Sequence, residues 1–298
     1  MMKITKISRV LHLHDHRRFY SRVLTRRILP FHYLIFEKTF GRDPESKPLL
    51  KSLINSIVRE EDRITNIEKL SLLEKQLGFH LEAVQERESP ELIKRFNIEI
   101  QVAQDENYDT RAVQSMSKYH SDCLDQLGPR DSYKNSSMPK TISIHLSNHS
   151  ILPAQYPFHT EFILMERNTK MQYPSECVTM HVLEFDKCKA DVDSLKTPLE
   201  EWWAFFMKTY KFLHADEVDL IKTFKTSEVR TALQNIEVMR FTDYELNFYD
   251  SHLRHVDMIK MEATMEMAQR MIEIGSDNQF IAKITGLEFS VIEEMRNS

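Results

Sequence analysis

The sequence predicts an α/β domain followed by an all-helical region, and three observations lead to this fold class. Segments with apolar residues at every second position, typical of strands, cluster between residues 78 and 185. Amphipathic helical segments at 43–58 and 105–127 precede and interrupt those strands. From Pro198 onward every segment has helical spacing. We therefore expect a basic extension at 1–30, an α/β domain at 31–190 and a helical C-terminal region at 191–298.

The composition is that of an ordinary globular protein, with 41% hydrophobic and 29% charged residues in a chain of 298. No apolar run approaches the roughly 20 residues that a membrane helix requires, so no membrane partner is expected. The cysteines Cys123, Cys177 and Cys188 form no C-x-x-C pair. Their number and spacing argue against a disulfide framework or a zinc knuckle, and favour a reducing, cytoplasmic compartment.

The net charge of −5 conceals a strongly basic start to the chain. Residues 1–30 contain eight lysines and arginines against a single acid, Asp15. Such a segment can contact phosphates or an organelle import machinery. A solvated terminal tail explains the same composition equally well.

The first half of the α/β domain contains a helix and a hairpin. Leu49, Leu50, Leu53, Ile54 and Ile57 have helical spacing and follow a Pro/Ser-containing start. Residues 78–84 alternate as a strand, 85–91 are polar with a proline, and 96–101 alternate again, so the two strands are expected to form a hairpin.

A helix and three strands complete the domain. The expected helix at 105–127 carries one apolar stripe, and 140–146, 159–165 and 177–185 alternate as strands. The stripe consists of Tyr108, Ala112, Met116, Tyr119, Cys123 and Leu127.

In the C-terminal region, the aromatic residues Trp202, Trp203, Phe205 and Phe206 are most simply core residues. A long helix or two is expected at 244–275, and two short helices are expected around Thr285 and Gly286. The short pair resembles a helix-turn-helix. Because its second helix is acidic, it would repel phosphates, which favours packing or dimerisation over DNA reading.

The strand at 96–101 raises a chemical question, because its second face is wholly polar. Phe96, Ile98 and Ile100 alternate with Asn97, Glu99 and Gln101. If the hairpin turn is centred between Pro90 and Glu91, Glu82 lies opposite Glu99.

Directly opposite residues have Cβ atoms about 5 Å apart, and two carboxylates that close repel unless a cation lies between them. Mg²⁺ suits such a site because it takes one or two carboxylates plus waters and substrate phosphates. A solvent-facing strand with a salt-bridged glutamate explains the same pattern.

Several motifs, taken in order, resemble a known family. They are "FEKTFG", "LLKSLINSIV", "NIEIQ", "YDTRAVQSMSKYHSDCLDQLG", "MPKTISIHL", "MHVLEFDK" and "IAKITGLEFSVIEEM". Their order and spacing, from about Leu29 to Met295, resemble the recombination-promoting nuclease and transposase family, a branch of the PD-(D/E)XK nucleases.

The resemblance implies a PD-(D/E)XK nuclease-like core, in which a mixed β-sheet with an active-site hairpin is flanked by helices. It also implies a DNA endonuclease that depends on Mg²⁺ or another divalent cation, hydrolyses phosphodiester bonds, and acts in recombination or transposition. By the resemblance, Glu99 is the central metal-binding acid and Glu82 the first-strand acid and second metal ligand. Gln101 takes the place usually given to lysine, which positions the attacking water or the phosphate. The expected catalytic set is therefore Glu82, Glu99 and Gln101.

Three departures from the family pattern leave a second function open. The first-strand acid is a glutamate rather than an aspartate, and the hairpin turn is longer than usual. Tyr33 and Glu37 stand where the family has an aspartate and a lysine. The alternative is a catalytically decayed nuclease fold that only binds DNA or a protein.

Arg111 and Lys118, on the helix after the active strand, are the candidates for contacts with the DNA backbone. An ordinary solvated helix face explains them as well. DNA is the expected partner, no small-molecule cofactor is expected, and a homo-oligomer is left open.

Overall fold

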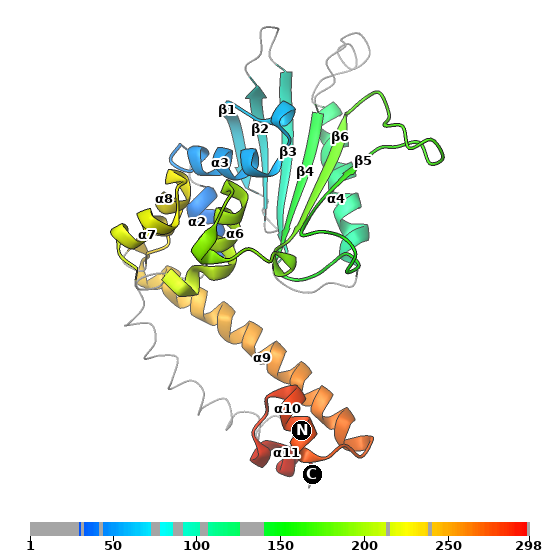
Figure 1. Cartoon of the computed structure of the whole chain (residues 1–298), viewed down its shortest axis with the longest axis vertical. Helices are drawn as coiled ribbons and strands as arrows, with labels where there is room; N and C mark the ends of the chain where they lie inside the picture. The colour runs from blue at the N-terminus through cyan, green and yellow to red at the C-terminus, as the bar shows by residue number, and fades with distance from the viewer. Residues whose placement is uncertain are drawn as a thin grey trace. The chain divides into compact units, whose positions relative to one another are not determined.

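The computed structural model of the chain describes residues 30, 33–41, 44–72, 78–85, 92–101, 107–125, 140–212, 215–237 and 240–296 (Figure 1). The basic segment at 1–29 lies outside this part. The chain divides into two compact units, Met1–Arg240 and Phe241–Ser298. The helices at 198–235 therefore belong to the unit that contains the sheet, and the boundary lies later than the predicted one at residue 190. No helix in the described ranges has the length and apolar content needed to cross a membrane.

The first unit is built on a six-stranded mixed sheet with the strand order β1-β2-β3-β4-β6-β5 (Figure 1). Strands β3, β4 and β6 are parallel to one another, and the remaining pairs are antiparallel. The predicted mixed α/β fold is confirmed; β1, which has no clean alternation of apolar residues, was not predicted. The strands are β1 Asn66–Leu72, β2 Gly78–Gln85, β3 Leu92–Gln101, β4 Lys140–Ser147, β5 His159–Ile163 and β6 Val178–Glu184.

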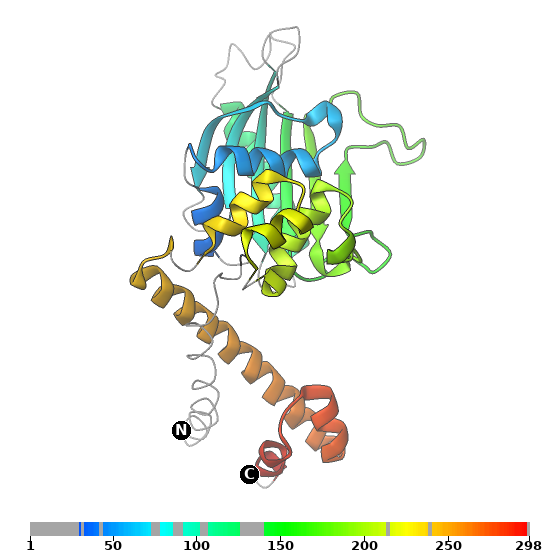
Figure 2. The same ribbon diagram turned by 60° about the vertical axis from the view of Figure 1, so that its left-hand side comes forward.

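Helices α3, α6 and α8 cover one face of the sheet (Figure 2). The helices of this layer are α2 Tyr33–Phe40, α3 Lys47–Ile57, α6 Pro198–Lys208, α7 Glu217–Thr223 and α8 Ser227–Asn235. Its centre is aromatic: Phe40 lies 5.6 Å from Trp202 and 6.1 Å from Phe206, measured between ring centroids. All four predicted aromatic core residues are buried, and so are the five apolar residues predicted for α3. Such offset and tilted ring pairs stabilise a core beyond the area they bury.

Helix α4 (Tyr108–Asp125) covers the other face of the sheet. Its buried residues are Tyr108, Ala112, Tyr119 and Cys123, which confirms four residues of the predicted stripe. Met116 is only half-buried, and Leu127 lies outside the described residues. The Tyr108 ring contacts His145 near the end of β4, and His120 contacts Thr141 near its start. The helix therefore runs antiparallel to β4, as expected for a helix that connects two parallel strands.

The second unit consists of α9 (Asp243–Glu273), α10 (Asn278–Thr285) and α11 (Phe289–Arg296). The predicted pair of short helices is confirmed. Gly286 closes α10 with a φ of 70°, a left-handed conformation that glycine adopts at no steric cost. Ala268, Ile281 and Ile292, one from each helix, form the buried centre of this unit.

A half-buried histidine, His159, and a buried one, His181, lie side by side on β5 and β6. Nε2 of His159 is 3.1 Å from Nδ1 of His181. Burial lowers the pKa of both rings, and the neighbouring His159 lowers that of His181 further, to about 3. Nε2 of His181 is buried and makes no hydrogen bond within the described part of the chain. Both rings are therefore neutral at pH 7.

We expect this pair to make the first unit acid-sensitive. The folded pKa of His181 lies below the unfolded value near 6.5, so protonation favours the unfolded chain. Stability is complete above pH 6.5 and falls by about 1.4 kcal/mol per pH unit between 6.5 and 3. Denaturant unfolding at pH 7.0 and 5.5 measures this loss. His181→Phe, which cannot take up a proton at this position, should reduce the loss to the contribution of His159, and an unchanged pH dependence in that variant would contradict the assignment.

Candidate active site

Strand β4 has two faces of opposite chemistry. Ile142, Ile144 and Leu146 alternate with a row of polar residues, and every side chain of the strand is buried. The polar row faces α4, because His145 contacts Tyr108 and Thr141 bonds to His120. It consists of Thr141, Ser143, His145 and Ser147. The strand was predicted from its sequence but this polar row was not, although the alternation in "TISIHLS" is its signal.

Strand β3 pairs in parallel with β4, so every second residue of β3 lies opposite a residue of this polar row. Glu99 pairs with His145, and Gln101 pairs with Ser147. Paired positions of neighbouring strands share a face of the sheet, so positions 99 and 101 belong to the face covered by α4. Their side chains lie outside the described part of the structure. The backbone thus places the two predicted residues at the carboxyl end of β3, beside an imidazole and a hydroxyl.

Strands β2 and β3 form the predicted antiparallel hairpin, but the predicted register is wrong. Gln85 pairs with Leu92, so the turn is centred between residues 88 and 89 rather than between 90 and 91. Consequently Glu82 pairs with Arg95, and Glu99 pairs with Gly78. Glu82 and Glu99 remain on one face but four positions apart, about 13 Å along the strand. The pairing that suggested a shared cation for these two acids is absent.

In the observed register, Glu82 on β2 pairs with a basic residue on β3, Arg95. Arg95 is buried, with only 5% of its surface exposed, and opposite charges on paired strand positions stabilise a sheet by up to about 1 kcal/mol. We therefore expect Glu82→Ala to lower the free energy of unfolding by about 1 kcal/mol and to leave the cleavage rate nearly unchanged. Thermal unfolding and DNA nicking measure the two effects. Loss of cleavage in a folded Glu82→Ala protein would restore Glu82 as a metal ligand.

The two candidates for DNA contacts lie at different places along α4. The guanidinium of Arg111 is 5.5 Å from the ring centre of Tyr108, whose ring lies 5.7 Å from that of His145. Arg111 is exposed at the end of the helix near the Glu99 position. Lys118, also exposed, follows seven residues later, about 10 Å along the helix. Of the two, Arg111 is the better placed to contact a phosphate at the Glu99 position.

An ion pair lies at the end of β6, in the row that contains Gln101 and Ser147. Glu184 is fully buried, and its Oε2 is 2.7 Å from Nζ of Lys187. Its Oε1 accepts hydrogen bonds from the backbone amides of Ile151 and Leu152 at 2.5 and 2.7 Å. A buried carboxylate requires such partners, and here they are supplied by the loop that follows β4.

Further bonds tie the same loop to the end of β6. Nζ of Lys187 donates to the carbonyls of Leu152 and Pro153 at 2.9 and 3.1 Å. The hydroxyl of Ser150 donates to Asp186 at 2.6 Å. We call Glu184, Asp186 and Lys187 the β6 clamp, because together they fix residues 150–153. These residues belong to the motif "MHVLEFDK", which carried the family resemblance but predicted no role for them.

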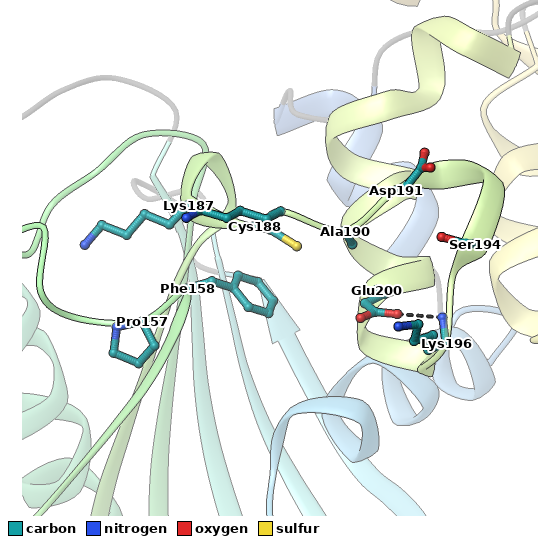
Figure 3. Close-up of a pocket in the computed structure, with 10 residues that line it drawn as sticks. Pro157, Phe158, Lys187, Cys188, Ala190, Asp191, Ser194, Lys196 and Glu200 are labelled. Atoms are coloured by element: carbon teal, nitrogen blue, oxygen red, sulfur yellow. Dashed lines mark hydrogen bonds between the residues drawn. The ribbon is translucent and has the colours of Figure 1, made fainter.

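A cavity of about 560 Å³ lies beyond the clamp, between residues 157–158, the segment after β6 and the start of α6 (Figure 3). The carboxylates that line it already accept hydrogen bonds from nearby backbone amides. Asp191 accepts one from the amide of Asp193, and Glu200 accepts one from the amide of Lys196. Burial raises the pKa of the Cys188 thiol, which keeps it protonated and unreactive. The cavity contains none of the predicted site residues, and we assign no catalysis to it.

A divalent cation is compatible with the positions that the register brings together. Glu99 offers a carboxylate and Gln101 an amide oxygen on one face of the sheet, and Mg²⁺ needs only one or two carboxylates plus water and phosphate oxygens. Among the described side chains, no group of three or more His, Cys, Asp or Glu residues could hold a metal ion. Glu99 lies outside that set.

The sheet order, the hairpin and the helix α4 that connects two parallel strands define a nuclease-like α/β core. A family model described as PD-(D/E)XK nuclease family transposase matches residues 30–264 of the chain. The chain therefore belongs to the PD-(D/E)XK nuclease family transposases, as the motifs had indicated, and membership indicates a nuclease role linked to transposition. Neither the comparison with curated proteins nor the comparison with solved structures gives a match.

Proposed function

We propose that this protein is a DNA endonuclease that depends on Mg²⁺ or another divalent cation and acts in transposition or recombination. One observation carries the proposal: in a chain of this family, Glu99 and Gln101 lie on one face at the carboxyl end of β3, paired with His145 and Ser147. Ligand sites of α/β sheets commonly lie at the carboxyl ends of parallel strands.

In this proposal Glu99 holds the cation, which when bound supplies Lewis-acid stabilisation of charge on the phosphate. Gln101, one position further along the same face, orients the water or the scissile phosphate through its amide. Arg111, exposed on the first turns of α4, contacts a neighbouring phosphate of the DNA backbone. Glu82 is left out of this set, because its assignment rested on a register that the structure does not have.

We also propose a location and a partner for the protein. Cys123, Cys177 and Cys188 form no disulfide in the described part of the chain, which fits a reducing cytoplasm. DNA is the proposed partner.

A decayed nuclease that only binds DNA or a protein is the second candidate function, and the hairpin register favours it. The position of β2 that pairs with Glu99 is Gly78, which has no side chain to offer a second acid. Tyr33 and Glu37 in α2 also depart from the family pattern. One carboxylate in place of two would weaken metal binding.

Plasmid nicking with and without Mg²⁺, alongside DNA binding in EDTA, separates the two functions. We expect slow nicking that requires the cation and stops when EDTA is added. DNA binding with no cleavage under Mg²⁺ or Mn²⁺ would establish the decayed fold instead.

A further inference from the structure

The loop after β4 begins with Asn148 and His149 and ends in residues that the β6 clamp fixes. This histidine follows two residues after Ser147, the β4 position that pairs with Gln101. It is half-buried, and the hydroxyl of Ser147 donates to its backbone carbonyl at 2.8 Å. The loop thus holds one imidazole at the edge of the sheet where the proposed active site lies.

The hydrogen bonds of His149 determine which ring nitrogen is protonated. Nδ1 lies 2.9 Å from the side-chain oxygen of Asn148, which can only accept a hydrogen bond. Nδ1 therefore carries the proton, and Nε2 has a free lone pair. Nε2 makes no hydrogen bond within the part of the chain that the structure describes. An oriented imidazole with an open nitrogen is the arrangement that a general base requires.

The surroundings keep this ring neutral. Burial lowers the pKa of His149 below its ordinary value, against a smaller opposite effect of Asp186 and Glu184. Glu184 is itself paired with Lys187, which limits its influence. At pH 7 the imidazole can therefore accept a proton.

We propose that His149 is a catalytic residue that takes the proton of the attacking water. The proposal rests on the nuclease function proposed above. As the water oxygen forms a bond to phosphorus, its proton moves to Nε2 of His149 and the bond from phosphorus to the leaving oxygen breaks. The leaving oxygen takes a proton from solvent, and the imidazolium returns its proton to solvent.

Other described histidines on the α4 face do not fit this role. His145 is fully buried, and its Nε2 lies 2.9 Å from the hydroxyl of Ser143. His120 bonds to Thr141, at the opposite end of the strand. It is nevertheless a matched control, because burial lowers its pKa as well.

The test compares His149→Gln with His120→Gln in single-turnover cleavage of a DNA duplex. We expect His149→Gln to lose about 100-fold in rate, the usual contribution of a general base, and to lose the acidic limb of the pH–rate profile. DNA binding in Ca²⁺ and the thermal midpoint should match those of wild type. His120→Gln should cleave within about threefold of wild type, since it lacks any catalytic role.

A substrate with sulfur as the bridging leaving atom separates a base from an acid. Because sulfur leaves without protonation, such a substrate would rescue a variant that lacks a general acid, whereas His149→Gln should remain slow. Imidazole NMR of the metal-free protein should show the Nδ1-protonated tautomer of His149 with a pKa below 6.5. The Nε2-protonated tautomer, or rescue by the sulfur substrate, would overturn the proposal.

Two further results separate this proposal from the nuclease function itself. If wild type cleaves, Glu99→Gln does not, and His149→Gln cleaves like wild type, the role of His149 alone is wrong. If wild type cleaves under no divalent cation, the proposed nuclease function fails and the role of His149 fails with it.

Discussion

Glu99→Gln should abolish cleavage while leaving the fold and DNA binding intact. The substitution keeps the shape of the side chain and removes the charge that would hold the cation. Loss of this ligand removes several kcal/mol of transition-state stabilisation, so we expect a rate at least about 1,000-fold lower. DNA binding should persist or tighten, because a negative charge near the phosphates has gone.

Nicking rates across a Mg²⁺ titration, with DNA binding measured in Ca²⁺, test this expectation. Gln101→Ala is the companion variant, and it should reduce the rate without weakening the dependence on Mg²⁺ concentration, since its proposed role is orientation. A folded Glu99→Gln protein that cleaves as fast as wild type would remove Glu99 from the active site.

Lys187→Met should destabilise the first unit by about 3 kcal/mol. The substitution keeps a long side chain but leaves Glu184 charged and fully buried, without its cation. Removing one partner of a buried ion pair costs far more than the pair contributes, because the remaining charge stays unpaired. Lys189→Met, two residues away and exposed, is the control, and it should change stability by less than about 0.5 kcal/mol.

Tryptophan fluorescence during denaturant unfolding is a specific probe for this experiment. Both tryptophans of the chain, Trp202 and Trp203, lie in α6, so the signal reports the first unit alone. Equal stabilities of wild type and Lys187→Met would show that the Glu184–Lys187 pair does not hold the loop after β4. In that event Glu184→Gln should also leave the free energy of unfolding unchanged.

Local periodicity predicted most elements of the fold, but not strand β1. Helix α3 and strand β4 have spacings that follow directly from which face is buried, and the capped start of α6 follows from Thr197, Pro198 and Glu200. Strand β1 was missed because its residues Asn66–Leu72 mix charged and apolar side chains without a clean alternation. Its place is set by pairing with β2, which is tertiary information.

The candidate site could be predicted only in part. A polar residue at every second position is ordinary on a half-buried strand, so Glu99 and Gln101 stood out through the resemblance of "NIEIQ" to the family motif. The partner of Glu99 could not be derived, because a shift of the turn by two residues exchanged Glu82 for Gly78 opposite it. His145 lies opposite Glu99 through parallel pairing of segments far apart in sequence, which no local pattern encodes.

The parallel pairing of β3 with β4 also has a consequence for biosynthesis. The hairpin of β2 and β3 uses neighbouring residues and can form as soon as it emerges from the ribosome. The polar row opposite Glu99 belongs to β4, and the β6 clamp belongs to residues 184–187. The proposed active site therefore forms only when segments that are distant in sequence come together. Such non-local contacts form late in folding. We expect a nascent chain that ends before residue 184 to carry the acidic strand without a working site, which would postpone cleavage of DNA until synthesis of the first unit is nearly complete.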